Sequence, residues 1–518
     1  MDVDNDLDSF PLVEKNTTPE DESGPEAASK WELLILTIPF FGLQLTWTVQ
    51  QVYGVPYLST LGIPDTRMPL FVLSGPLAGL IAPPVVAALS DACQSPWGNR
   101  KPFIYLGGLG TILSFLLLAA AQPIADTFTY GLLGLSNPDA AMAGAQIIAA
   151  FSIYTLNFSI QPLQLGLRAS VIDHFPPHQQ PTANLWIGRF SALGSVCLAL
   201  VGFGYSPNFW NLTVVVTSVL AMLLLFAALT NTAKPESQWS EVPREIAPTS
   251  LRSHIYRLLR KTSNLPPVTR RTCQVQLVSW FAWFFVLNYT SALISHAYEN
   301  HDVSSTRDKK PATPSAASAS AVSRVALLFH ITALITLIIV SLVWRRSGKR
   351  TRADSIADDR RMGPHNENGG LARTRHVLMR WVWKPCLVIL ALSLAATCLL
   401  LVCAKPSSAV ATTISILLGA NGMLFALSNW VPYALIADEA SAQARARAML
   451  TVEGDPVDHE DATPGLLAVH MMAITAPQIV AAIASWLLMQ GLAILGFEEH
   501  AVWNFVMCVP AALWAACL

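Results

Sequence analysis

The chain has 518 residues, of which 53% are hydrophobic and 13% are charged. Ordinary soluble domains carry about 25% charged residues, so this composition argues against a soluble globular protein and predicts a membrane protein with many spans. The formal net charge of -1 gives no indication of nucleic-acid binding, because the charges are segregated by region.

The first 31 residues form an acidic segment. Residues 1–30 contain nine acids against two lysines and have no apolar core, which predicts a disordered tail. A positively charged region of the kind that begins a signal peptide is missing. We therefore expect the first hydrophobic segment to be a retained membrane span.

Twelve apolar segments follow, and each has the roughly 20 residues that a helix needs to cross a bilayer. They are residues 32–53, 68–89, 102–122, 143–167, 184–205, 211–231, 276–297, 322–344, 385–404, 410–436, 464–490 and 500–517. The sequence thus predicts an all-α membrane protein with twelve transmembrane helices.

Lysine and arginine concentrate in alternate loops. The loop after the sixth predicted span holds eight basic residues, the loop of residues 345–384 holds eleven, and the short loop after the second span holds Arg100 and Lys101. Because basic loops stay in the cytoplasm, both termini are predicted to be cytoplasmic. The plasma membrane is the expected location, with a vacuolar or other internal membrane as the alternative.

The fourth predicted span carries a polar stripe. Asn157, Gln161, Gln164 and Arg168 are spaced by four, three and four residues, so they share one face of a helix. An arginine inside a bilayer costs roughly 3 kcal/mol or more and usually faces a bundle interior or a wet cavity. The stripe is predicted to line a solute pathway. The alternative is that Arg168 reaches lipid phosphates from the helix end while the amides bond neighbouring helices.

The first predicted span carries a second polar stripe, formed by Gln44, Thr48 and Gln51, with Trp47 nearby. Amide groups and aromatic faces together suit the recognition of a sugar, so this span is a candidate second wall of the site. Hydrogen bonding between helices explains the stripe equally well. Trp283 in the seventh span is either a further cavity aromatic or an ordinary interfacial tryptophan.

Six spans, a basic loop and six further spans are the layout of a major facilitator transporter. The predicted parts are a half of residues 32–231, a cytoplasmic linker of residues 232–275 and a half of residues 276–518 that includes the loop 345–384. The loop LSDACQSPWGNRKPF resembles the signature loop of that superfamily. The resemblance implies that Asp91, Arg100 and Lys101 tie helices together in one conformational state. The two basic residues also fit simple cytoplasmic anchors.

Further charged residues lie at the predicted cytoplasmic ends of spans. From its position, Arg189 in the fifth span is predicted to pair with Asp173 across a cytoplasmic gate. Asp438 and Glu439 end the tenth span just before the basic stretch ARARAM. We interpret these two acids as partners in gating or loop salt bridges.

The chain resembles the sucrose and α-glucoside:proton symporters of the glycoside-pentoside-hexuronide:cation group, especially their fungal branch. The resemblance rests on ordered motifs from the first span to the eleventh. They are GLQLTWTVQQVYGVPYLSTLGIP in span 1, Gln164, Arg168, Ala169 and Asp173 around span 4, Trp186, Gly188, Arg189 and Gly194 in span 5, WFAWF in span 7, NWVPYALIADE in span 10, and His470, Pro477 and Gln478 in span 11. It implies that Arg168 contacts solute or the proton-carrying acid.

Several positions depart from that family pattern. Asn157 stands where the resemblance implies the proton-carrying aspartate, and an amide cannot titrate near neutral pH. Gln50 and His296 replace expected glutamates. His296, His470 and Asp173 remain the candidates for proton coupling, although a hydrogen-bonded structural histidine explains each histidine as well.

These observations predict a secondary transporter for a sucrose-like or other glycoside, with or without proton coupling. The alternatives are an exporter of a small secondary metabolite, an uncoupled facilitator, and a non-transporting sensor or scaffold, which the chain's end at Leu518 disfavours. The sequence holds no nucleotide-binding loop, no nucleophile constellation and no CxxC pair among its eight cysteines. We expect no enzyme activity, no cofactor, no metal site and no nucleic-acid partner, and we expect a monomer.

Overall fold

The computed structural model describes residues 29–93, 95–98, 100–175, 180–204, 208–230, 265–305, 316–358, 378–452, 462–496 and 500–518. The predicted tail up to residue 28, most of the predicted linker and the centre of the loop 345–384 lie outside these residues. So do the side chains of Asp91, Asp173 and Asp438.

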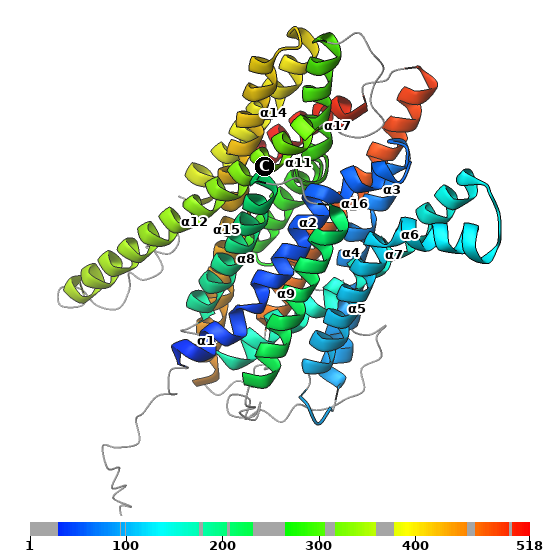
Figure 1. The fold of residues 1–518 in the computed structure, drawn as a ribbon. Coiled ribbons are helices and arrows are strands. Elements are labelled where there is room, and N and C mark those ends of the chain that lie inside the picture. The colour runs from blue at the N-terminus through cyan, green and yellow to red at the C-terminus, as the bar shows by residue number, and fades with distance from the viewer. Residues whose placement is uncertain are drawn as a thin grey trace, which may run out of the picture.

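The described residues form a bundle of helices (Figure 1). In the first half these are α1 (Lys30–Thr37), α2 (Pro39–Thr60), α3 (Met68–Val72), α4 (Ser74–Ala92), α5 (Lys101–Ala119), α6 (Ala121–Asp126), the π-helix η1 (Thr127–Leu132), α7 (Pro138–His174), α8 (Gln180–Gly204) and α9 (Phe209–Thr230). In the second half these are α11 (Pro267–Ser305), α12 (Ala316–Asp358), the π-helix η2 (Leu378–Trp383), α14 (Lys384–Cys403), α15 (Ser408–Val452), α16 (Ala462–Ile494) and α17 (His500–Cys517).

Each of the twelve predicted spans is helical: the first falls on α1 and α2, the second on α3 and α4, and each of the others falls mainly on one helix. Among the described residues, eleven helices are long and apolar enough to cross a bilayer, and the apolar helix Val502–Cys517 is shorter. Several helices extend well past the predicted bounds: α7 begins at Pro138, where Asn137 caps the first turn by accepting from the backbone N–H groups of Asp139 and Ala140. The helical segment formed by α6 and η1 was not predicted.

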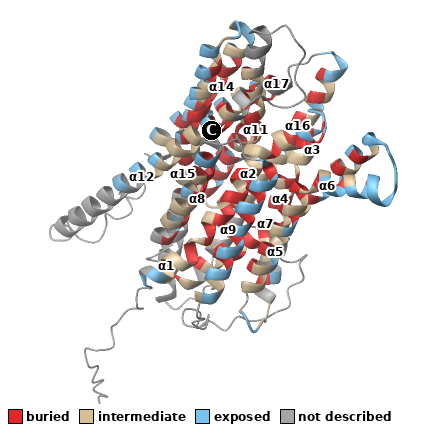
Figure 2. Ribbon diagram, viewed as in Figure 1, coloured by how far each residue is buried: buried red, intermediate tan, exposed pale blue. Residues whose placement is uncertain are grey.

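The hydrophobic core divides along the chain. One large cluster of buried side chains lies entirely between Leu33 and Leu224, and another lies between Ala282 and Ala512. Figure 2 shows the buried residues between the helices and the exposed ones on the outer surface. Where the two sets of helices meet, α2 packs on α11, α8 packs on α12, and α3 and α4 pack on α16.

Glycine permits the closest approaches between helices. A Cβ atom at Gly107 of α5 would lie 2.6 Å from the backbone nitrogen of Leu163 in α7. At Gly422 of α15 it would run into the carbonyl oxygen of Phe329 in α12. Both contacts are with backbone, which cannot swing aside, so these two helix pairs depend on glycine.

Candidate functional site

Helices α2 and α7 run in opposite directions, and the polar stripe of α7 faces α2. Three contacts define the alignment: the Trp47 indole Nε1 donates to Gln164 Oε1 at 3.1 Å, Gln50 Nε2 donates to Asn157 Oδ1 at 3.1 Å, and the Arg168 guanidinium lies over the Phe40 ring at 5.9 Å. The helical spacing predicted from the sequence therefore places all four polar side chains of α7 toward the bundle interior.

Asn157 is fully buried, and both hydrogens of its amide are used. Its Nδ2 donates to Ser74 Oγ at 2.9 Å and to the carbonyl of Ile153 at 2.8 Å, while its Oδ1 accepts from Gln50. The Ser74 hydroxyl in turn donates to the carbonyl of Phe71 at 2.7 Å. This network joins α2, α4 and α7 and is built for an amide, because two of the atoms facing Nδ2 are acceptors.

Gln161 differs from the other amides of the stripe. It is 6% exposed and makes no hydrogen bond with the described residues. A Cβ atom added at Gly79 in α4 would lie 3.9 Å from Gln161 Nε2 and 2.8 Å from Thr475 Cγ2 in α16. Gln161 is thus a nearly buried amide near the place where the two halves of the chain meet. Such a group is normally satisfied by a partner, which a solute could supply.

Arg168 lies three residues before the end of the apolar segment Pro138–Val171, closer to the helix end than to its middle. Among the described side chains, no carboxylate lies within ion-pair distance of it, and its Nε is buried without a hydrogen-bond partner. The aromatic face of Phe40 supplies its observed contact. Most N–H groups of the guanidinium are therefore available to a partner other than the described side chains, such as a solute.

The second predicted stripe, on α2, faces α8. Thr48 Oγ1 lies 3.0 Å from Ser195 Oγ, and a Cβ atom added at Gly194 of α8 would lie 3.5 Å from the Cβ of Gln44. Thr48 therefore makes a hydrogen bond between helices α2 and α8, which was the alternative to a contact with solute. Gln44 and Gln51 make no side-chain hydrogen bond with the described residues, so both amides remain able to bind a solute.

In the second half of the chain, the predicted aromatic and histidine positions are mostly buried. Trp283 is fully buried and packs edge-on against Phe425 at 5.2 Å, so it belongs to the core of that half. His470 is also fully buried and lies edge-on to Tyr433 at 4.9 Å, with no hydrogen-bond partner at either ring nitrogen. His296 is partly buried near the end of the apolar part of α11.

The predicted gate residues lie at one end of the bundle, which we call the 93–100 end after the turn between α4 and α5 (lower end in Figure 1). There Arg100 Nη1 donates to Ser90 Oγ at 2.6 Å, and Lys101 begins α5. The Arg189 guanidinium stacks on Trp186 at 5.2 Å. The predicted pairing of Arg189 with Asp173 involves a side chain outside the described residues.

Glu439 has a different role from the predicted salt bridge. Its buried carboxylate accepts hydrogen bonds from the backbone nitrogens of Val268 at 3.1 Å and Thr269 at 2.6 Å, and from Thr269 Oγ1 at 2.6 Å. Val268 and Thr269 are the second and third residues of α11. The carboxylate of α15 therefore caps the start of α11, where exposed N–H groups and the helix dipole attract an anion.

Substituting Glu439 by alanine should destabilise the fold. The change would leave two N–H groups and a buried hydroxyl without an acceptor, at a cost of roughly 3 kcal/mol. Glu439→Gln keeps one acceptor oxygen and should lose less. Asp139→Ala is the matched control, because Asp139 is an exposed acid in the first turn of α7. Thermal unfolding of the purified protein measures all three, and equal losses for Glu439→Ala and Asp139→Ala would refute the buried cap.

Several parts of this site were missed by sequence reasoning. Ser74 and Gly79 on α4 and Thr475 on α16 gave no signal, because single small residues in apolar helices are common. Gln50 stood out as a departure from a family pattern but was not assigned to the site. The amide at position 157, in place of an expected acid, was the second sequence signal for this network.

Comparisons with known proteins agree with the fold and with the sugar-transporter resemblance. Residues 36–262 match the family model described as MFS/sugar transport protein. The general alpha-glucoside permease of Schizosaccharomyces pombe is 29% identical over 294 residues, covering 55% of this chain and 52% of the permease. A sucrose transport protein of Oryza sativa subsp. indica is 32% identical over 177 residues, covering 33% of this chain and 32% of that protein.

The chain therefore matches about half the length of the permease and about a third of the sucrose transport protein. Solved structures match nearly its whole length. A D-xylose-proton symporter aligns with a TM-score of 0.53 at 13% identity, covering 94% of this chain and 97% of the symporter. A peptide transporter, POT, aligns with a TM-score of 0.55 at 12% identity, covering 94% and 93%. At such identities the likeness establishes the major facilitator fold and leaves the solute open.

Proposed function

We propose that this all-α membrane protein, which has the major facilitator fold and resembles α-glucoside and sucrose transport proteins, moves a glycoside across a membrane by alternating access. The observation that carries the proposal is the unpartnered amide of Gln161, nearly buried close to α16 of the other half. In the major facilitator architecture, the solute site lies between the two halves near the bilayer midplane.

The side chains around Gln161 suit a polyhydroxylated solute. Amides both donate and accept hydrogen bonds, as sugar hydroxyls do, and Arg168 offers a fixed fork of donors. Trp47 adds an indole whose nitrogen is already satisfied by Gln164, so its ring is held in place. The names of the matched relatives, an α-glucoside permease and a sucrose transport protein, support α-linked glucosides as the class to test first.

The hydrogen bonds between the two halves support alternating access. Tyr53 OH and Ser323 Oγ lie 3.3 Å apart, and Gln490 Nε2 donates to the carbonyl of Thr66 at 3.5 Å. Both pairs lie toward the end of the bundle at the turn 61–67, which we call the 61–67 end. Passage of a solute through the 61–67 end would require these bonds to break. With the basic loops inside the cell, the 93–100 end faces the cytoplasm.

A second candidate is an uncoupled facilitator, which the Asn157 network favours. An amide holds that position with both hydrogens engaged, so it offers no proton-binding group. We propose that glycoside movement follows the solute gradient unless His470, His296 or Asp173 supplies coupling. We further propose a monomeric transporter of the plasma membrane.

The test is uptake of labelled sucrose and of labelled maltose into proteoliposomes, with and without an inward proton gradient. We expect saturable uptake of at least one sugar, unchanged by the proton gradient. Accumulation driven by the gradient would establish a symporter and refute the uncoupled mode. A folded, correctly inserted protein that moves neither sugar would refute α-glucosides as the substrate class and direct the search to exported metabolites.

A further inference from the structure

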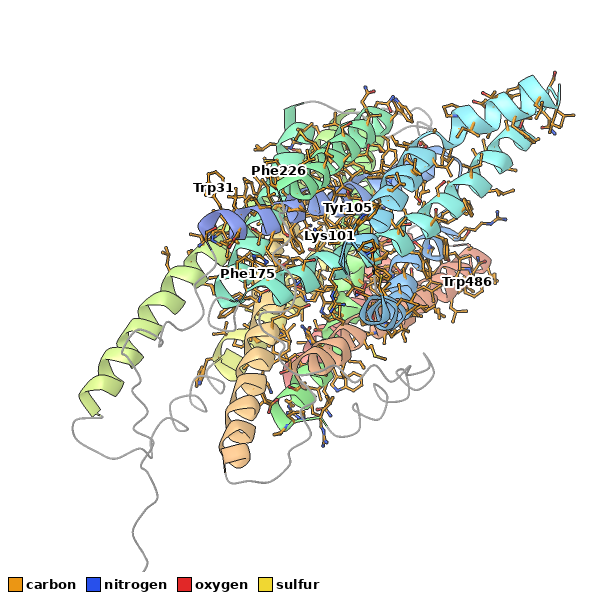
Figure 3. The ribbon with its side chains drawn as sticks, turned by 90° about the horizontal axis from the view of Figure 1, so that it is seen from below. Trp31, Lys101, Tyr105, Phe175, Phe226 and Trp486 are labelled. Carbon is orange, nitrogen blue, oxygen red and sulfur yellow. The ribbon has the colours of Figure 1, made fainter. Side chains whose placement is uncertain are left out.

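A helical hairpin leaves the side of the bundle between α5 and α7. It consists of α6, η1, the turn that follows and the first turns of α7, and Figures 1 and 3 both show it extending away from the other helices. The 19 residues of α5 already cover about 28 Å, close to the thickness of a bilayer core. Gln146 of α7 donates to the carbonyls of Leu61 and Gly62 at the 61–67 end. The hairpin therefore begins at the membrane boundary on that side.

The tip of the hairpin exposes large apolar side chains. No charged residue occurs between Asp126 and Asp139. Leu132 is 74% exposed, and six further large apolar residues of the hairpin are exposed: Ile124, Phe128, Tyr130, Leu133, Leu135 and Met142. Figure 2 shows this region mainly in the colour of exposed residues. Clusters of this kind on a protein surface mark contact with a membrane or with another protein.

The backbone of the tip suits an apolar environment. The N–H of Leu133 donates to the carbonyl of Phe128 at 3.0 Å, and the N–H of Leu135 donates to the carbonyl of Thr129 at 3.0 Å. The Thr127 hydroxyl donates to the carbonyl of Pro123 at 2.8 Å. These bonds satisfy some of the polar groups of the tip within the hairpin itself, which lowers the cost of placing the turn against lipid.

The apolar surface of the hairpin continues the lipid-facing surface of the bundle. Along α7 it passes into Ile147 and Phe151, and along α5 into Leu113 and Leu109, all of them exposed. Helix pairs that associate in membranes use small residues at their contact, whereas this tip presents leucines, phenylalanine and tyrosine. Tyrosine, represented here by Tyr130, concentrates at the boundary between lipid and water.

We propose that this hairpin is a lipid anchor that lies in the leaflet at the 61–67 end, with its apolar tip among the upper parts of the acyl chains. The hairpin leaves the side of the bundle in both views, which suits an element at the membrane interface (Figures 1 and 3). The anchor braces α5 and α7, the helix that carries the polar stripe, against the bilayer.

The test places the photo-cross-linking amino acid benzoylphenylalanine at Leu132 of the full chain in liposomes, followed by mass spectrometry. Leu106, which is 71% exposed on α5, is the lipid-facing control, and the exposed Asp65 in the turn 61–67 is the water-facing control. We expect lipid adducts at Leu132 with a yield comparable to that at Leu106 and well above that at Asp65. The same probe at Leu133 repeats the measurement if the first variant folds poorly.

Two outcomes would overturn the anchor. A covalent dimer in place of lipid adducts would assign the tip to a second copy of the chain. A yield at Leu132 and Leu133 as low as that at Asp65, with Leu106 still labelled, would place the tip in water.

Discussion

Replacing Asn157 by aspartate should turn passive sugar uptake into uptake driven by a proton gradient. An ionised carboxylate at this fully buried position would face two acceptors, Ser74 Oγ and the carbonyl of Ile153, which now receive hydrogens from the amide. A protonated carboxyl can donate to one of them, so burial and geometry both favour proton binding. The proton would leave only when the site opens to water on the other side, which couples its movement to that of the solute.

The expected size of the effect follows from the gradient. One pH unit supplies about 1.4 kcal/mol, so transport of one proton per sugar allows roughly tenfold accumulation inside the liposome. The measurement is the ratio of internal to external labelled sugar for Asn157→Asp, with and without an uncoupler that collapses the gradient. Asn157→Ala is the control, since it also breaks the network but adds no titratable group. Equal accumulation by both variants would contradict this mechanism.

The sequence predicted the helices well because the bilayer imposes a simple rule. A run of about 20 apolar residues must be helical, and all twelve predicted runs are helical in the structure. The rule gives no information on apolar segments that are too short to cross the bilayer. The hairpin of α6 and η1 was missed for this reason, since its short apolar run reads as a loop between two spans.

The candidate site was predicted in part, and the reason again is periodicity. Spacings of four and three placed Gln161, Gln164 and Arg168 on one face, and in the structure that face meets α2. Periodicity cannot say which residue of another helix completes each contact. The capping of α11 by Glu439 joins residues 170 positions apart and has no local sequence signal. In WFAWF, five consecutive aromatic and small residues cover every face of the helix, so the burial of Trp283 could not be read from the run.

Removing the guanidinium in Arg168→Ala should nearly abolish sugar uptake. The guanidinium has no ion-pair partner among the described side chains and a buried Nε with no hydrogen-bond partner. If it donates to the solute, the loss of a charged hydrogen bond costs roughly 1.5–3 kcal/mol, which corresponds to about a tenfold to hundredfold loss in uptake at low sugar concentration. The apparent KM should rise, because the interaction binds the sugar before the protein changes conformation.

Two control variants separate this role from a structural one. Arg168→Lys keeps the charge but loses the planar fork, so its uptake should lie between that of the wild type and that of Arg168→Ala. Arg67→Ala removes an exposed guanidinium from the turn 61–67 and should leave the KM unchanged. If Arg168→Ala instead lowers the unfolding temperature and leaves the KM at the wild-type value, then its contact with Phe40 stabilises the packing of α2 on α7. In that case the solute binds elsewhere, with Gln161 the first residue to test.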